Sequence, residues 1–199
     1  LLDYLAHAGL VGIANPIGFE ITPDAKRPDF NTVWTGQAGL ALPDRDYYLK
    51  DDARFVEMRG KYQAYVTDVL TMAGRKDAAE AARRVMEFET RLAEASWPRV
   101  DLRDPTKIYN PFDLTGAAKA TPGLDWTRYF AGLGIKGHDQ LVVGQPSYFA
   151  EVGKALEDVP LATWKDYLQV RVIDAHAPYL NDALVQKHFD FYGRTLSGT

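Results

Sequence analysis

The 199-residue sequence has no cysteine, which excludes a disulfide framework, a thiolate nucleophile and a metal site built on cysteine. This absence does not decide between a cytoplasmic and a periplasmic location. No apolar run approaches the roughly 20 residues that a membrane-spanning helix needs. An excess of one charge is also lacking, because 23 Lys and Arg residues stand against 27 Asp and Glu, for a net charge of −4. Without a positive field, we expect no nucleic-acid partner.

Catalytic motifs are missing as well. No two of the four histidines, His7, His138, His176 and His188, are four residues apart, so the spacing of a hydrolytic zinc helix is absent. No serine lies in a Gly-x-Ser-x-Gly elbow. We therefore expect no catalytic residue and no metal ligand within this chain.

Three glutamates and one glycine-rich stretch could be mistaken for a site. Glu87, Glu89 and Glu94 fall on a predicted helix, and we interpret them as a solvated polar face, because an acid–base pair needs desolvation and convergent geometry. The Gly-x-Gly-x-x-Gly pattern at residues 132–137 follows a predicted helix and precedes a predicted strand. A dinucleotide-binding loop has the opposite order, so we interpret these glycines as a helix stop.

What the chain does contain is hydrophobic periodicity. With 46% hydrophobic and 25% charged residues it has the composition of a globular protein, and apolar residues recur every three or four positions over most of its length. This predicts a mainly α, multi-helix fold, with helices over residues 55–73 and 78–95, one opening with Thr163, and a break near Pro178. We find no repeat or linker and expect one mainly helical body. The side chains expected to be largely buried are Tyr47, Tyr48, Phe55, Tyr62, Val66, Val69, Phe88 and Leu92.

Strand signals are confined to short stretches. Ile17, Phe19 and Ile21 alternate with polar or small residues, and a polar turn separates them from a second strand-like stretch that ends at Trp34. We expect a small β-hairpin over residues 19–34 as the only substantial strand pairing. Residues 140–143 could add a brief strand.

The segment Gly39–Leu49, which we call the joint, separates the hairpin from the long helices. Pro43 cannot continue a strand ladder, and Asp44 can accept hydrogen bonds from free amides at the start of a helical turn. Tyr47 and Tyr48 supply apolar surface that would pin the turn in place. From the residues alone, we interpret the joint as a capped turn with two core tyrosines.

The joint resembles the Leu-Pro-x-Arg-Asp-Tyr-Tyr segment of the neprilysin and endothelin-converting enzyme family of zinc metalloendopeptidases, including its bacterial oligopeptidase members. Other segments agree in the right order, and the resemblance covers essentially all 199 residues. It implies structural motif residues, and no catalytic or metal residue, at positions of this chain. The residues concerned are Pro43, Asp44, Arg45, Asp46, Tyr47, Tyr48, Trp164, Phe189 and Tyr192, supported by Glu87-x-Glu89, Asp104-Pro105 and Tyr109-Asn110.

In that family an N-terminal helical region and a C-terminal region with His-Glu-x-x-His enclose a cavity that limits substrates to peptides. The resemblance implies that residues 1–199 are the N-terminal, substrate-enclosing region of a longer chain, without the catalytic zinc domain. Zinc would then belong to the full-length parent and not to this fragment, which we expect to be inactive alone. Its partners would be the C-terminal catalytic domain and, in the parent, peptide substrates. The alternative is a free-standing helical protein-binding or scaffold module.

Two further expectations follow from this resemblance. Apolar surface that would face the missing domain should be exposed, so the fragment could self-associate. Vertebrate members use disulfides, so the lack of cysteine favours a bacterial relative of periplasmic or cell-envelope location, with the cytoplasm left open.

Overall fold

The computed structural model describes residues 1–199 and divides them into two compact units. Unit 1 consists of Leu1–Gly39 and Ala95–Val159, and unit 2 consists of Leu40–Glu94 and Pro160–Thr199. The predicted mainly α class is confirmed, because 61% of the residues are helical. The division into two units was not foreseen, since no stretch of linker composition marks the points where the chain passes from one to the other.

Unit 1 is built on a four-stranded sheet with the order β1-β2-β4-β3. The predicted hairpin is confirmed as an antiparallel pair of β1 and β2, in which Phe19 lies opposite Thr35. The expectation that this would be the only substantial strand pairing is wrong: β4 pairs parallel to β2, and β3 pairs antiparallel to β4. The four strands are β1 (Ile17–Pro23), β2 (Asn31–Gln37), β3 (Pro111–Asp113) and β4 (Gln140–Val143).

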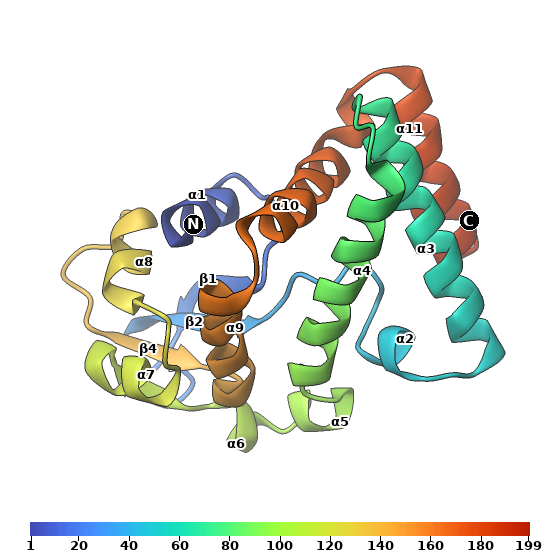
Figure 1. Cartoon of the computed structure of the whole chain (residues 1–199). Coiled ribbons are helices and arrows are strands. Elements are labelled where there is room, and N and C mark those ends of the chain that lie inside the picture. Colours follow the sequence, from blue (N-terminus) through green and yellow to red (C-terminus); the bar gives the residue numbers. More distant parts are fainter. The chain divides into compact units, whose positions relative to one another are not determined.

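Helices of unit 1 lie beside this sheet (Figure 1), and the unit has an aromatic core. Trp126 meets Tyr129 and Phe149 edge to face, with ring centroids 5.9 and 5.5 Å apart, and all three rings are buried. Tyr148 adds a fourth buried ring, whose hydroxyl donates to a backbone carbonyl. The helices of this unit are α1 (Leu2–Leu10), α5 (Arg99–Leu102), α6 (Pro105–Ile108), α7 (Leu114–Ala120), α8 (Trp126–Gly132) and α9 (Pro146–Asp158).

Unit 2 is helical throughout. Its two longest helices, α3 and α4, run in opposite directions from a short connection, as their sequence spacing predicted (Figure 1). Gly74 ends the first of them with a positive φ of 84°. The helices of unit 2 are α2 (Asp46–Leu49), α3 (Ala53–Met72), α4 (Ala78–Ala95, whose last residue belongs to unit 1), α10 (Leu161–His176), the 3₁₀ turn η1 (Ala177–Tyr179), α11 (Asp182–His188) and the π-helix η2 (Phe189–Ser197).

Two of the eight expected core side chains are only partly buried. Tyr47 and Phe55 are half-buried and pack edge to face, with ring centroids 5.0 Å apart. Tyr47 belongs to the short α2, and Phe55 belongs to the first turn of α3. The other six, Tyr48, Tyr62, Val66, Val69, Phe88 and Leu92, are buried as expected.

The start of α10 also differs from the expectation. The helix begins at Leu161, with Pro160 at the N-cap, so Thr163 lies inside the first turn and caps nothing. Asp166 is buried, and its carboxylate is bound by Arg75 at 2.9 Å and Arg84 at 2.7 Å. These two arginines tie the α3–α4 connection and α4 to α10.

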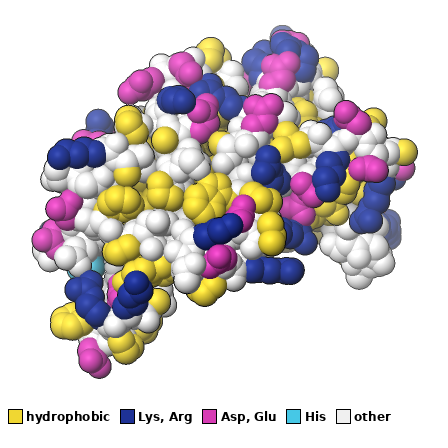
Figure 2. Space-filling model, turned by 90° about the horizontal axis from the view of Figure 1, so that it is seen from below, with side chains coloured by type: hydrophobic (Ala, Val, Ile, Leu, Met, Phe, Trp, Pro, Cys, Tyr) yellow, Lys and Arg dark blue, Asp and Glu magenta, His cyan; other side chains and the backbone are white.

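None of the helices has the length and apolar character that a membrane crossing requires. On the face drawn in Figure 2, hydrophobic side chains reach the surface in several places between side chains of both charges. Large apolar side chains that are more than half exposed include Tyr179, Val100, Phe30, Ile21 and Leu161.

Candidate functional site

The joint is attached to α4 mainly through one tyrosine. The hydroxyl of Tyr48 accepts hydrogen bonds from the backbone amides of Ala41, at 3.1 Å, and Leu42, at 3.0 Å. The same hydroxyl donates to the carboxylate of Glu89 at 2.6 Å. A single buried side chain therefore closes the joint into a loop and attaches it to a charged group in the helical core.

Glu89 is the centre of a buried polar cluster. Its side chain has no exposed surface, and it forms an ion pair with Arg171 of α10, whose side chain is 4% exposed. Tyr62 of α3 donates to the same carboxylate at 2.9 Å and accepts a hydrogen bond from Arg171 at 3.0 Å. We call Tyr48, Tyr62, Glu89 and Arg171 the buried cluster. It joins three helices and the joint through one carboxylate.

A second carboxylate lies beside the buried cluster. Asp174 is 3.6 Å from the guanidinium of Arg171 and accepts hydrogen bonds from Tyr65, at 2.6 Å, and Tyr192, at 2.9 Å. Phe191 stacks on Tyr65 with ring centroids 4.8 Å apart. These contacts dock the C-terminal π-helix onto α3 and α10.

The electrostatics of the cluster keep its proton donors protonated. Burial and the negative charge of Glu89 raise the pKa values of Tyr48 and Tyr62 well above 10.0. Burial is the largest single influence on Arg171 and opposes its charge, but Glu89, Tyr62, Tyr167 and Asp174 together outweigh it and hold the pKa of Arg171 well above its ordinary value. The tyrosine hydroxyls therefore remain donors and the guanidinium remains charged across the physiological range.

Pro43, Asp44 and Arg45 lie in the turn before α2, and Asp46 is the first residue of that helix. Pro43 is exposed, and the carboxylate of Asp44 accepts a hydrogen bond from the amide of Asp46 at 2.8 Å, as expected for a capping residue. Asp46 forms an exposed ion pair with Lys50 at 2.7 Å. Arg45 is half-buried, and its Nε has no hydrogen-bond partner. These contacts stabilise the turn and bring no two groups together for chemistry.

The later motif residues are spread over the C-terminal part of unit 2. Trp164 is buried against Phe88, with ring centroids 4.6 Å apart. Phe189 is 43% exposed and lies 5.3 Å from the guanidinium of Arg194. Tyr192 binds Asp174. Of the nine motif residues, only Tyr48 belongs to the buried cluster.

Glu89 was misread from the sequence. Glu87 and Glu94 are exposed, as predicted, but Glu89 is fully buried. The signal was available, because Glu89 follows Val85 by four residues and precedes Leu92 by three, on the apolar face of α4. Nothing in the sequence indicated its partner, since Arg171 is 82 positions away.

No group of three or more His, Cys, Asp or Glu side chains has the arrangement needed to hold a metal ion. His7, His138 and His176 are exposed, and His188 packs on the ring of Tyr192 with centroids 4.6 Å apart. The residues of this chain therefore do not fit a zinc site.

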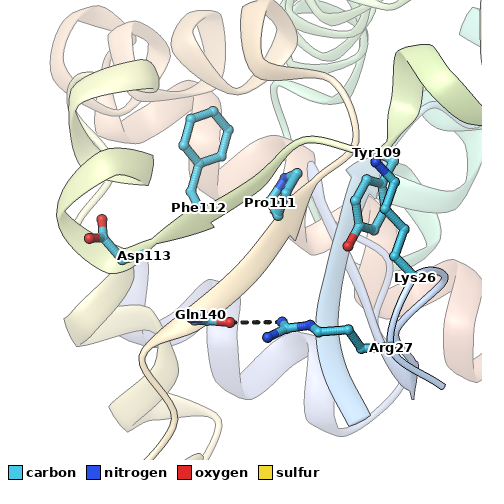
Figure 3. A pocket seen from close by; sticks show the side chains of 7 residues that line it. All are labelled: Lys26, Arg27, Tyr109, Pro111, Phe112, Asp113 and Gln140. Carbon is cyan, nitrogen blue, oxygen red and sulfur yellow. Dashed lines mark hydrogen bonds between the residues drawn. The ribbon is translucent and has the colours of Figure 1, made fainter. Parts of the chain in front are cut away.

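Unit 1 has a surface pocket of about 420 Å³ beside the turn between β1 and β2, which we call the hairpin-turn pocket (Figure 3). Arg27 donates to the amide oxygen of Gln140 at 2.9 Å, and the ammonium of Lys26 lies 4.8 Å from the centre of the Tyr109 ring. The turn is fixed by the buried carboxylate of Asp24, which accepts from the amides of Lys26 and Arg27 and from the Tyr109 hydroxyl, each at 2.9 Å. The lining residues are Lys26, Arg27, Tyr109, Pro111, Phe112, Asp113 and Gln140.

The fold is similar to that of a known zinc metalloprotease. A sequence model described as Peptidase family M13 matches residues 1–199, so the chain belongs to this family. Neprilysin-3 of Drosophila melanogaster is 28% identical over 152 residues, which are 72% of this chain and 19% of that protein. The zinc metalloprotease Zmp1 of Mycobacterium tuberculosis, solved in complex with an inhibitor, is 32% identical with a TM-score of 0.93.

The same mycobacterial protease, solved in an open state, is 31% identical with a TM-score of 0.92. Both comparisons with it cover 100% of this chain and 31% of the protease. The chain thus spans less than a third of the length of the relatives it matches.

Proposed function

We propose that residues 1–199 are the substrate-enclosing, size-selecting part of a zinc metalloendopeptidase that hydrolyses peptides. The observation that carries the proposal is the likeness of the whole chain to a zinc metalloprotease of about three times its length, while the chain itself has no cluster of metal-ligating side chains. The zinc ligands and the general base would then come from the C-terminal catalytic domain, which would be the chain's principal partner.

The contribution of this chain is enclosure. Walls that close around a substrate exclude water and set which substrates enter, and they work only if they are rigid. Unit 2 has the rigidity, because the buried cluster fastens three helices and the joint to one carboxylate. That the related mycobacterial protease was solved in an open state supports a site that opens and closes.

The experiment compares residues 1–199 with the intact protein that contains them. The intact protein should hydrolyse short peptides, lose that activity to a chelator, and leave folded proteins and long polypeptides uncut. Residues 1–199 with added zinc should hydrolyse nothing, because no positioned ligands or water are present. Chelator-sensitive hydrolysis by the fragment would overturn the assignment of the ligands to another domain. Equal cleavage of short peptides and long polypeptides by the intact protein would overturn size selection.

A further inference from the structure

The hairpin-turn pocket of unit 1 has two cationic side chains that its own carboxylates do not fully neutralise. No ion pair joins Lys26 to a carboxylate, and its ammonium lies over the Tyr109 ring. Arg27 is bound by the neutral amide of Gln140 at 2.9 Å, and its only ion pair, with Asp24, has a separation of 4.0 Å. An anionic group in the pocket could therefore accept hydrogen bonds from two positively charged groups, the ammonium of Lys26 and the guanidinium of Arg27.

The backbone of the turn that carries these two cations is fixed before any ligand arrives. Asp24 has a side chain that is 1% exposed, and it binds the backbone amides of Lys26 and Arg27 together with the hydroxyl of Tyr109. Those bonds, led by the Lys26 amide, outweigh the effect of burial and hold the pKa of Asp24 below its usual value. The turn is therefore preorganised, which lowers the entropy that binding must overcome.

Three of the other five lining residues supply apolar surface, and the pocket is small. The Tyr109 ring, Pro111 and Phe112 contribute walls, and the volume of about 420 Å³ is at the lower end of the range for sites that bind small molecules. Pro111 has no amide N–H, so the edge strand β3 offers no donor there for an added strand. The edge of this short strand therefore lacks one donor, which favours recognition by side chains over strand addition.

One acidic group limits the ligand's charge. Asp113 lines the pocket at the far end of β3 from Tyr109, and its carboxylate caps α7 by accepting from the amide of Gly116 at 2.5 Å (Figure 3). A second anionic group on the ligand would be repelled there. The lining thus suits one carboxylate attached to one apolar group.

We propose that the hairpin-turn pocket binds the carboxylate of an apolar amino-acid residue, either as the free amino acid or as the C-terminal residue of a peptide. Lys26 and Arg27 bind the carboxylate, and Tyr109 and Pro111 contact the apolar side chain. The proposal does not require that the chain belongs to a peptidase, because it concerns binding alone.

The test is isothermal titration calorimetry on the intact protein, with N-acetyl-phenylalanine and its neutral amide as probes. The acid should bind at least about tenfold more tightly than the amide, and its affinity should fall as salt is raised. Replacing both cations, in Lys26→Gln with Arg27→Gln, should weaken binding of the acid about tenfold or more. Gln140→Glu should also weaken binding of the acid about tenfold or more, because the new carboxylate pairs with Arg27 while the side chain keeps nearly the same size. Lys119→Gln, an exposed lysine of unit 1 outside the pocket, should change nothing.

Two further probes identify the source of the carboxylate. Tighter binding of Ala-Ala-Phe than of phenylalanine assigns the pocket to peptide C-termini, and the reverse assigns it to free amino acids. The proposal is overturned if acid and amide bind equally, if no probe binds at millimolar concentration, or if the double variant and Gln140→Glu bind like Lys119→Gln while all retain the same circular dichroism.

Discussion

Removing the charge of Glu89 should destabilise unit 2 more than any surface substitution. In Glu89→Gln the side chain keeps its shape, but Arg171 stays buried without its main counterion, since burial of Arg171 is nearly complete and Asp174 is 3.6 Å away. Breaking a buried pair by removing one partner costs about 3–5 kcal/mol. The hydrogen bonds that Tyr48 and Tyr62 donate to the carboxylate also weaken when the acceptor is neutral.

Hydrogen exchange followed by mass spectrometry is the suitable assay, because a chain with two compact units need not unfold in one step. A loss of 3–5 kcal/mol corresponds to exchange that is faster by about 100-fold to several thousand-fold, at about 1.4 kcal/mol for each factor of ten. The acceleration should be largest in peptides from α3, α4, α10 and the joint, which the buried cluster connects. Peptides from the sheet of unit 1 serve as the internal reference.

Glu87→Gln is the matched control, two positions away on the same helix. Its carboxylate is 61% exposed in an ion pair with Arg83, so its loss should cost less than about 1 kcal/mol. The second control is Glu89→Gln combined with Arg171→Met, which removes both charges and should recover part of the lost stability. If the amides of α4 exchange as slowly in the Glu89→Gln protein as in the Glu87→Gln protein, the reasoning about the buried cluster is refuted.

Four other outcomes are expected. A Cβ added at Gly153 would lie 1.9 Å from the carbonyl oxygen of Pro122, so Gly153→Ala should destabilise unit 1 by roughly 1–3 kcal/mol or more. Gly60 has open space around it, so Gly60→Ala should be neutral or stabilising. A denaturant titration in which Gly60→Ala is the less stable of the two variants would contradict the packing. The folded-state pKa values of Tyr48, Tyr62, Tyr65 and Tyr192 are raised above 10.0, so the stability they contribute is present below pH 10 and is lost as the pH rises above it. Exposed tyrosines such as Tyr179 should ionise first, followed at 295 nm by a second rise that coincides with unfolding of unit 2, and complete tyrosine ionisation before unfolding would contradict this. Residues 1–199 should self-associate through exposed apolar side chains such as Tyr179 and Leu161, and a concentration-independent monomer in analytical ultracentrifugation would argue against it. In the intact protein a chelator should remove both zinc and activity, and activity retained after complete loss of zinc would exclude a zinc mechanism.

The helical fold was readable from the sequence because its signals are local. The three-to-four spacing in α3 and α4, the glycine at position 74 and the proline at position 146 each act within one or two turns of backbone. The third strand was missed for the opposite reason. Pro111–Asp113 is three residues long, and its pairing with Gln140–Val143 depends on a partner that follows two helices later.

The buried cluster could not be predicted because it depends on contacts between residues that are far apart in the sequence. A glutamate on an apolar helix face is stable only if a buried cation reaches it, and Glu89 and Arg171 come from helices far apart in the chain. Tyr48 was expected to be buried, but its role in binding two amides of the joint depends on that same carboxylate. The hairpin-turn pocket likewise combines residues from the turn, β3 and β4, which no local pattern links.

The most direct test of the proposed function is the dependence of kcat/KM on peptide length in the intact protein, with zinc content measured on the same samples. Tyr48→Phe removes the hydroxyl that binds Ala41, Leu42 and Glu89, and Tyr47→Phe is the adjacent control. If residues 1–199 enclose the substrate, Tyr48→Phe should shift the length limit for cleavage while zinc content stays unchanged, and Tyr47→Phe should shift neither. A Tyr48→Phe protein that lost its zinc but kept its fold and its length limit would contradict the assignment of enclosure to this chain.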